Sequence, residues 1–171
     1  MEEKGSIPIT YEDFCDKVSK FTGHDFQDFC NRYQSIFYRK FRATKARGRL
    51  GDYACDGIII PNERLLACYG FYNDTKEIGK AIAKKMKDDF VNMLEEHPNI
   101  ECMIFMTKTS GMEKTVIKKI EELESKEFQL NNIKRFKNFK SDPDRFIVKK
   151  IEYVDCQVMF NRLRDIKKGE M

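Results

Sequence analysis

The residues best placed for chemistry lie between Gly48 and Gly70, in the stretch GRLGDYACDGIIIPNERLLACYG. Asp56 stands directly before a short apolar run, Gly57–Ile60. A turn containing proline and asparagine then leads into a second apolar run, Leu65–Tyr69. Two runs of this type joined by a short turn predict a β-hairpin, with Asp56 at the mouth of its first strand.

The hairpin places other side chains near this carboxylate. Ala67 and Tyr69 share one face of the second strand because alternate residues of a strand point the same way. Metal-assisted phosphodiester cleavage needs carboxylates that hold Mg²⁺ against the phosphate. Asp56 and Asp52 are therefore the candidate metal ligands, and Mg²⁺ is the cofactor expected if the site is active. The alternative is structural, since an aspartate before a glycine also forms turns.

A basic loop runs straight into the hairpin. The segment RATKARGR contains four basic residues in eight: Arg42, Lys45, Arg47 and Arg49. A solvated loop and a phosphate-binding loop are both consistent with this composition. Its position beside Asp56 favours contact with DNA or RNA, so these four residues are the predicted nucleic-acid-binding set.

Hydrophobic periodicity places helices and strands around the hairpin. Thr10 caps a first helix that ends near Gly23. The remaining helices are expected over Asp25–Phe41, from a cap at Asn73–Thr75 to Glu96, over Met112–Phe128 and over Asp155–Ile166. Ile100–Met106 reads as a buried central strand and Phe146–Val154 as an edge strand. Lys134–Lys140 alternates basic and aromatic residues, a pattern found in single-strand binders and in amphipathic segments that pack on a core.

Composition limits the class of protein. The chain has 171 residues, 41% apolar and 35% charged, with a formal net charge of +4, so nucleic acid is allowed but not demanded. We expect one domain over residues 1–171, with flexible ends at 1–9 and 167–171. No signal-peptide pattern, membrane-length apolar run or CxxC pair is present, which favours a cytoplasmic protein with no membrane contact. The phosphate-binding GxxxxGK[ST] loop is absent, and neither His24 nor His97 has metal-site spacing.

These motifs resemble a known group of domains. The run G-x-x-G-D-x-x-C-D-G at Gly48–Gly57, followed by an apolar strand, a turn and Cys68-Tyr69-Gly70, resembles the restriction-endonuclease-like PD-(D/E)XK domains of the Mrr type. The branch found in bacterial anti-phage and ABC-type three-component systems is the most similar. Its helix pattern F-Q/E-x-F-C is matched by Phe26–Cys30. The resemblance covers about Gly23 to Phe90 and extends loosely into the Ile100 strand.

The resemblance also shows which motif positions have changed. It implies that Asp56 is the metal-binding aspartate and that Gln27 stands where active enzymes often have glutamate. Ala67 falls at the position of the second acid or glutamine, and Tyr69 at that of the lysine. Asp52, Asp25 or Asp28 are the carboxylates that could compensate for these losses.

The sequence therefore predicts an α/β fold of the restriction-endonuclease-like kind, a small mixed sheet flanked by helices. The first functional hypothesis is a degenerate nuclease domain that binds nucleic acid or a partner protein in a bacterial defence or mobile-element system. One alternative is an active Mg²⁺-dependent endonuclease with relocated acidic ligands. The other is a scaffold subunit that assembles with a larger ATPase.

Overall fold

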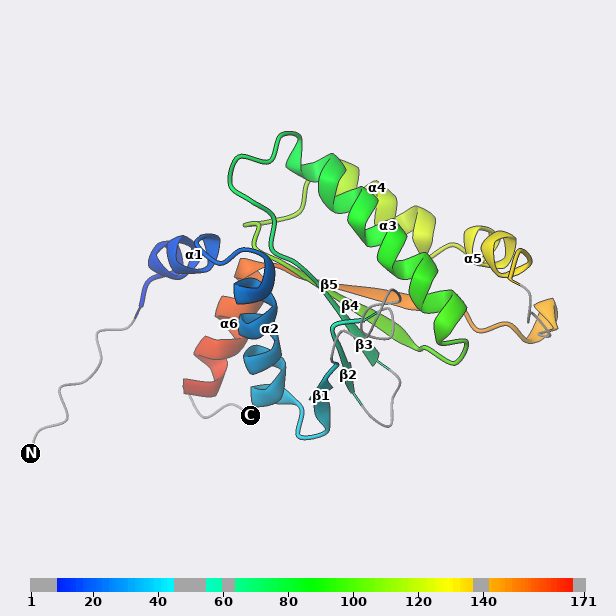
Figure 1. Ribbon diagram of the computed structural model, residues 1–171, viewed down its shortest axis with the longest axis horizontal. Helices are drawn as coiled ribbons and strands as arrows, with labels where there is room; N and C mark the ends of the chain where they lie inside the picture. Colours follow the sequence, from blue (N-terminus) through cyan, green and yellow to red (C-terminus); the bar gives the residue numbers. More distant parts are fainter. Residues whose placement is uncertain (1–8, 45–54, 60–63, 137–141, 168–171) are drawn as a thin grey trace, which may run out of the picture.

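One mixed sheet with helices on both faces forms the centre of the protein (Figure 1). The computed structural model describes residues 9–44, 55–59, 64–136 and 142–167. The strands are β1 (Phe41–Ala43), β2 (Gly57–Ile59), β3 (Arg64–Tyr69), β4 (Cys102–Thr107) and β5 (Lys150–Val154). The helices are α1 (Tyr11–Ser19), α2 (Gly23–Phe37), α3 (Ile78–Glu96), α4 (Lys114–Leu123), α5 (Lys126–Ile133) and α6 (Cys156–Lys167), with a short 3₁₀ helix η2 (Pro143–Arg145).

The strands lie in the order β1-β2-β3-β4-β5. β1, β2 and β3 are antiparallel neighbours, whereas β3, β4 and β5 run parallel. Parallel neighbours require crossover connections, and here α3 makes the first and α4 with α5 the second. The predicted α/β class with a small, helix-flanked mixed sheet is confirmed.

Two hydrophobic clusters cover the two faces of the sheet. Alternation along β3 divides its side chains: Leu66 and Cys68 face α1, α2 and α6, whereas Leu65 and Ala67 face α3, α4 and α5. Strand β4 is buried along its whole length, as predicted for a central strand covered on both faces. Figure 1 shows the two helical layers on opposite sides of the strands.

The predicted hairpin is confirmed, with strands at Gly57–Ile59 and Arg64–Tyr69. Its turn, with Ile60, lies outside the described residues. The helix predicted over Asp25–Phe41 is wrong at its end, because α2 stops at Phe37 and Phe41 begins strand β1. Phe41 pairs with Ile59 and is 5% exposed, so burial in the sheet outweighs the helical spacing of the aromatic residues.

The cap predicted at Asn73–Thr75 is also wrong. Helix α3 begins at Ile78 after Glu77, which adopts a left-handed conformation with φ of 50° and makes no side-chain cap. The Asn73 side chain instead accepts a hydrogen bond from the Lys108 ammonium at 3.2 Å. The Asn73 side chain therefore makes a tertiary contact and does not form the helix cap that the local sequence predicted.

The helix predicted over Met112–Phe128 is two helices, α4 and α5, separated at Glu124 and Ser125. Ser125 starts the second helix by accepting the Phe128 amide at 3.2 Å. Gln129 of this second helix exchanges hydrogen bonds with the Lys149 backbone beside strand β5. The break thus lets Gln129 satisfy the backbone amide and carbonyl of Lys149, which directly precedes the edge strand β5.

The remaining boundaries differ by a few residues. Thr10 caps α1 as predicted, accepting the Asp13 amide at 3.1 Å, but the helix ends at Ser19. β5 is an edge strand as predicted and is shorter than expected, and the closing helix is confirmed as α6. Of the segment Lys134–Lys140, residues 137–140 lie outside the described part, as do 1–8 and 168–171 at the two ends.

Candidate functional site

The backbone around Asp56 is tied to both neighbouring strands. Its amide donates to the Leu66 carbonyl at 2.7 Å, and its own carbonyl accepts the Thr44 amide at 3.2 Å. Gly57 is already the ladder partner of Leu66, so two successive residues face one residue of β3. This is the arrangement of a β-bulge, which interrupts the ladder and redirects a side chain.

The redirected side chain completes the hydrogen bonding of β3. The Asp56 Oδ2 atom accepts the backbone N–H of Cys68 at 2.7 Å, in place of a carbonyl from the interrupted strand. A charged acceptor makes a stronger hydrogen bond to an amide than a neutral one. Asp56 is half-buried at the start of β2, where the hairpin prediction placed it.

The changed motif positions lie on the second strand of the hairpin, on the α3 side of the sheet. Ala67 is 2% exposed, and its methyl group packs in the same cluster as the half-buried Tyr69. The Tyr69 ring contacts Phe71 edge-on, with ring centroids 5.7 Å apart. The shared face predicted for Ala67 and Tyr69 is confirmed, and both side chains are packed as ordinary strand residues.

Helix α3 brings two further charged residues to this region, Lys85 and Asp89. The Lys85 Nζ atom lies 2.8 Å from Asp89 Oδ1. Burial lowers the pKa of Lys85, but the Asp89 carboxylate, with Asp56 adding to it, outweighs burial and raises that pKa above 10.5. The Cys68 thiol responds to the same two carboxylates: burial and the adjacent Cys30 raise its pKa, and Asp56 and Asp89 add to the effect. Asp56 thus interacts electrostatically with the Lys85–Asp89 ion pair, and of these three residues only Asp56 was predicted as a site residue.

The other carboxylates named from the sequence stand apart. Asp25 and Asp28 are exposed on α2, which covers the opposite face of the sheet from α3. Gln27 is half-buried on the same helix, between the buried Phe26 and those exposed positions. The predicted compensation by Asp25 or Asp28 therefore does not occur at Asp56.

The predicted basic set is described in part. Arg42 lies in β1, where its exposed side chain donates to the Phe41 carbonyl at 2.9 Å. Arg42 pairs with Ile58 of β2, two residues along the strand from Asp56. Lys45, Arg47, Arg49 and the candidate ligand Asp52 lie outside the described residues.

These residues do not fit a Mg²⁺ site of the usual kind. The cation would need several oxygen ligands, and no group of three or more His, Cys, Asp or Glu side chains in the described part of the chain could hold a metal. One Asp56 oxygen already accepts the Cys68 amide. The Asp56 carboxylate therefore has a partner in the backbone of β3.

A second buried charge lies at the end of β4. Lys108 is 6% exposed, and its ammonium donates to the carbonyls of Ser19 at 2.9 Å and Phe21 at 3.0 Å, and to Asn73. It also lies over the Phe71 ring, 4.9 Å from the centroid. Burial lowers the pKa of Lys108, and the Cys156 thiol partly opposes this. These contacts tie the α1–α2 connection to the loop after β3.

A shallow pocket of about 170 Å³ lies at the other end of the hairpin, between Leu65, Ile58 and the segment Glu96–Asn99. Asp56 is not among its lining residues. The pocket therefore belongs to the packing of the C-terminal end of α3 against the strands.

Sequence reasoning did not identify Lys85 and Asp89 as site residues. The available signal was the spacing of four residues between them, which places both on one face of a helix. The spacing alone does not give the angle at which α3 crosses β3. That angle decides which lysine of α3 lies on the side of Asp56.

Comparison with protein-family models, curated proteins and solved structures gives no match to the chain. None of the described helices is long and apolar enough to cross a membrane.

Proposed function

We propose that the protein is a degenerate nuclease-like domain of the restriction-endonuclease-like fold, which binds nucleic acid without cleaving it. The observation that carries the proposal is the state of Asp56. Its carboxylate accepts the Cys68 backbone amide, and the motif positions on the next strand hold Ala67 and Tyr69, packed in the core, rather than an acid and a lysine. The order of helix, antiparallel hairpin, helix and parallel strand, from α2 through β4, supports the fold assignment.

The binding part of the proposal rests on the basic residues beside the hairpin. Arg42 is exposed in β1 and is followed by Lys45, Arg47 and Arg49 in the sequence. Phosphate contacts from such side chains give affinity without reading base sequence. The resemblance to Mrr-type domains implies that the protein acts as a component of a bacterial defence or mobile-element system, together with a protein partner.

Fluorescence anisotropy with labelled DNA and RNA duplexes at low salt tests the binding. The variant carrying Arg42→Gln, Lys45→Gln, Arg47→Gln and Arg49→Gln should bind at least tenfold more weakly, because about four phosphate contacts are lost. Arg32→Gln, at an exposed position on α2, is the control and should bind like the wild type. If the wild type has no affinity for either duplex, the binding proposal fails and a role in assembling a protein complex, such as one with an ATPase, takes its place.

The second candidate, an active Mg²⁺-dependent nuclease, is favoured by one observation. Asp89 acts electrostatically on the same neighbours as Asp56, as a relocated acid would. This candidate predicts divalent-metal-dependent cleavage that is lost in both Asp56→Ala and Asp89→Asn. Cleavage that survives Asp56→Ala would come from a contaminating enzyme.

A further inference from the structure

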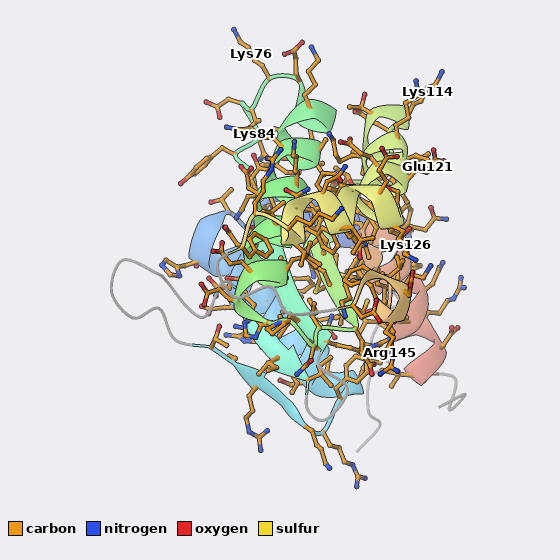
Figure 2. The ribbon with its side chains drawn as sticks, turned by 90° about the vertical axis from the view of Figure 1, so that its right-hand side faces the viewer. Lys76, Lys84, Lys114, Glu121, Lys126 and Arg145 are labelled. Atoms are coloured by element: carbon orange, nitrogen blue, oxygen red, sulfur yellow. The ribbon has the colours of Figure 1, made fainter. Side chains whose placement is uncertain are left out.

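The outer helical layer carries a group of lysines at one end. Lys76 lies just before α3, Lys80 and Lys84 lie on α3, and Lys114 and Lys118 lie on α4; all five are exposed. We call these five residues the α3–α4 lysine surface. Figure 2 shows Lys76 and Lys114 at the same end of this layer, with Lys84 below them.

The topology brings the two helices together at this end. β3 and β4 are parallel, so the helices that follow them both begin at the same edge of the sheet. The first turns are in close contact, since a methyl group added at Gly79 would meet the Glu113 side chain. Lysines four residues apart are about 6 Å apart along each helix, and packed helix axes are about 8–10 Å apart. The surface is therefore two short rows of positive charge.

Most of this charge has no ion-pair partner among the residues that the structure describes. Lys80 makes an exposed ion pair with Glu77 at 3.0 Å, a contact of little energetic value. The other four lysines of the surface make no ion pair with any residue that the structure describes. Their side chains are available to a ligand.

The placement opposes the stability of the helices. The first turns of α3 and α4 contain no acidic residue, and neither Glu77 nor Glu113 forms a side-chain cap. Lys80 and Lys114 lie in these first turns, where a positive side chain is unfavourable because it opposes the helix dipole. A bound polyanion would reverse this cost.

The other ends of the same helices carry the opposite charge. Glu95 and Glu96 end α3, and Glu121 and Glu122 lie in the second half of α4, all exposed. Figure 2 shows Glu121 below Lys114 on α4. A polyanion would therefore be attracted to the lysine end and repelled from the other, which confines where it can lie.

The surface suits a nucleic acid better than a protein. Protein interfaces need an apolar centre that excludes water, and α3 exposes no large apolar side chain. The exposed apolar residues near the surface are Tyr72, Met112 and Ile117, which belong to the loop before α3, the segment before α4 and α4 itself. Regularly spaced lysines instead match the regularly spaced charges of a phosphate backbone.

We propose that the α3–α4 lysine surface binds the phosphate backbone of a nucleic acid without reading its sequence. The inference rests on the proposed function and names a second contact region for it, away from the Arg42 strand. Each phosphate contact adds about 0.9 to the slope of log affinity against log salt for duplex DNA. The number of lysine contacts can therefore be counted directly.

The test measures binding of a labelled DNA duplex at several salt concentrations between about 50 and 200 mM. The double variant Lys84→Gln, Lys118→Gln should bind roughly tenfold more weakly at low salt and lower the slope by about 1.8. The charge-matched control is Lys17→Gln, Lys20→Gln on the exposed face at the end of α1, in the other helical layer. Lys84→Arg, Lys118→Arg should retain wild-type binding, because the charge is kept.

Each possible result of these binding measurements either supports or overturns the proposed phosphate contact. An unchanged slope in the Lys84→Gln, Lys118→Gln variant, with binding lost in the Arg42 set, overturns this inference and leaves the proposed function standing. An equal loss in the α1 control overturns it as well, since the effect is then one of net charge. Polyglutamate binding as tight as duplex binding would assign the surface to acidic proteins and overturn the inference. No duplex binding by the wild type overturns both proposals.

Discussion

Asp56 and Lys108 are charged residues beside the ends of strands, and their surroundings differ. The Asp56 carboxylate is half-buried, accepts one amide at 2.7 Å and has a lysine within electrostatic reach. The Lys108 ammonium is 6% exposed and is held by two backbone carbonyls and one amide oxygen. The first charge accepts a backbone amide and interacts electrostatically with Lys85, whereas the second is held by neutral dipoles.

Both charges are used by the fold, but to different extents. Lys108 has three acceptors for its three N–H bonds, so no donor is left for a ligand. Asp56 is half-buried, and its Oδ2 atom accepts the Cys68 amide at 2.7 Å. Both side chains therefore serve the fold, and we expect the fully coordinated Lys108 to contribute more to stability than Asp56.

The largest effect is expected for Lys108→Met. This substitution leaves the Ser19 and Phe21 carbonyls without their donor and should lower the free energy of unfolding by about 3 kcal/mol. Urea denaturation measures the change. The exposed Lys20→Met is the control and should alter stability by less than about 0.5 kcal/mol. Equal stability of the two variants would show that the buried ammonium is not a structural tie.

Alkaline pH should weaken the Lys108 region through Cys156. The Cys156 thiol donates to the Lys108 carbonyl at 3.2 Å, and burial raises its pKa to about 12, with Cys15 adding to the effect. The folded state then holds this proton more tightly than the unfolded state, whose thiol pKa is near 9. The contribution is complete below pH 9 and declines as the pH rises from 9 towards 12.

Comparison of the wild type with Cys156→Ala isolates this effect. The stability difference between the two should shrink as the pH rises above 9, by up to about 1.4 kcal/mol per pH unit. Unfolding in urea at pH 7, 9 and 10 provides the measurement. A difference independent of pH would mean that the thiol does not titrate differently on folding.

A moderate effect is expected at Asp56. Asp56→Ala leaves the Cys68 amide without its acceptor and should cost about 2 kcal/mol in unfolding free energy. Asp56→Asn keeps an acceptor oxygen and should cost about 1 kcal/mol or less. If the two variants are equally stable, the hydrogen bond to Cys68 does not contribute and the comparison with Lys108 fails.

The smallest effect is expected for Lys85→Gln. Lys85 and Asp89 lie four residues apart on α3, and their ion pair is partly exposed. Its loss should therefore lower the free energy of unfolding by about 0.3–0.5 kcal/mol. The same variant removes the positive charge near Asp56. Because the described side chains do not fit a Mg²⁺ site, isothermal titration should detect no Mg²⁺ binding by the variant, whereas measurable binding would show that the Lys85 charge excludes the cation.

The sequence predicted the hairpin and the central strand because their patterns are local. Apolar runs, an intervening turn and the position of Asp56 are all contained within about 20 residues. The prediction failed where a tertiary contact outweighed the local sequence pattern. Asn73 accepts a hydrogen bond from Lys108 instead of capping α3, and Phe41 joins the sheet instead of extending α2. Asp89 was missed for the same reason, since its relation to Asp56 depends on how α3 packs against β3.

The central claim is that the domain binds nucleic acid and does not need a metal to do so. The direct measurement is the affinity of the wild type for a labelled DNA duplex in EDTA and in Mg²⁺, with strand integrity checked on a denaturing gel. The account predicts binding of the same order in both buffers and intact strands. Strand cleavage that requires Mg²⁺ and disappears in Asp56→Ala would contradict it.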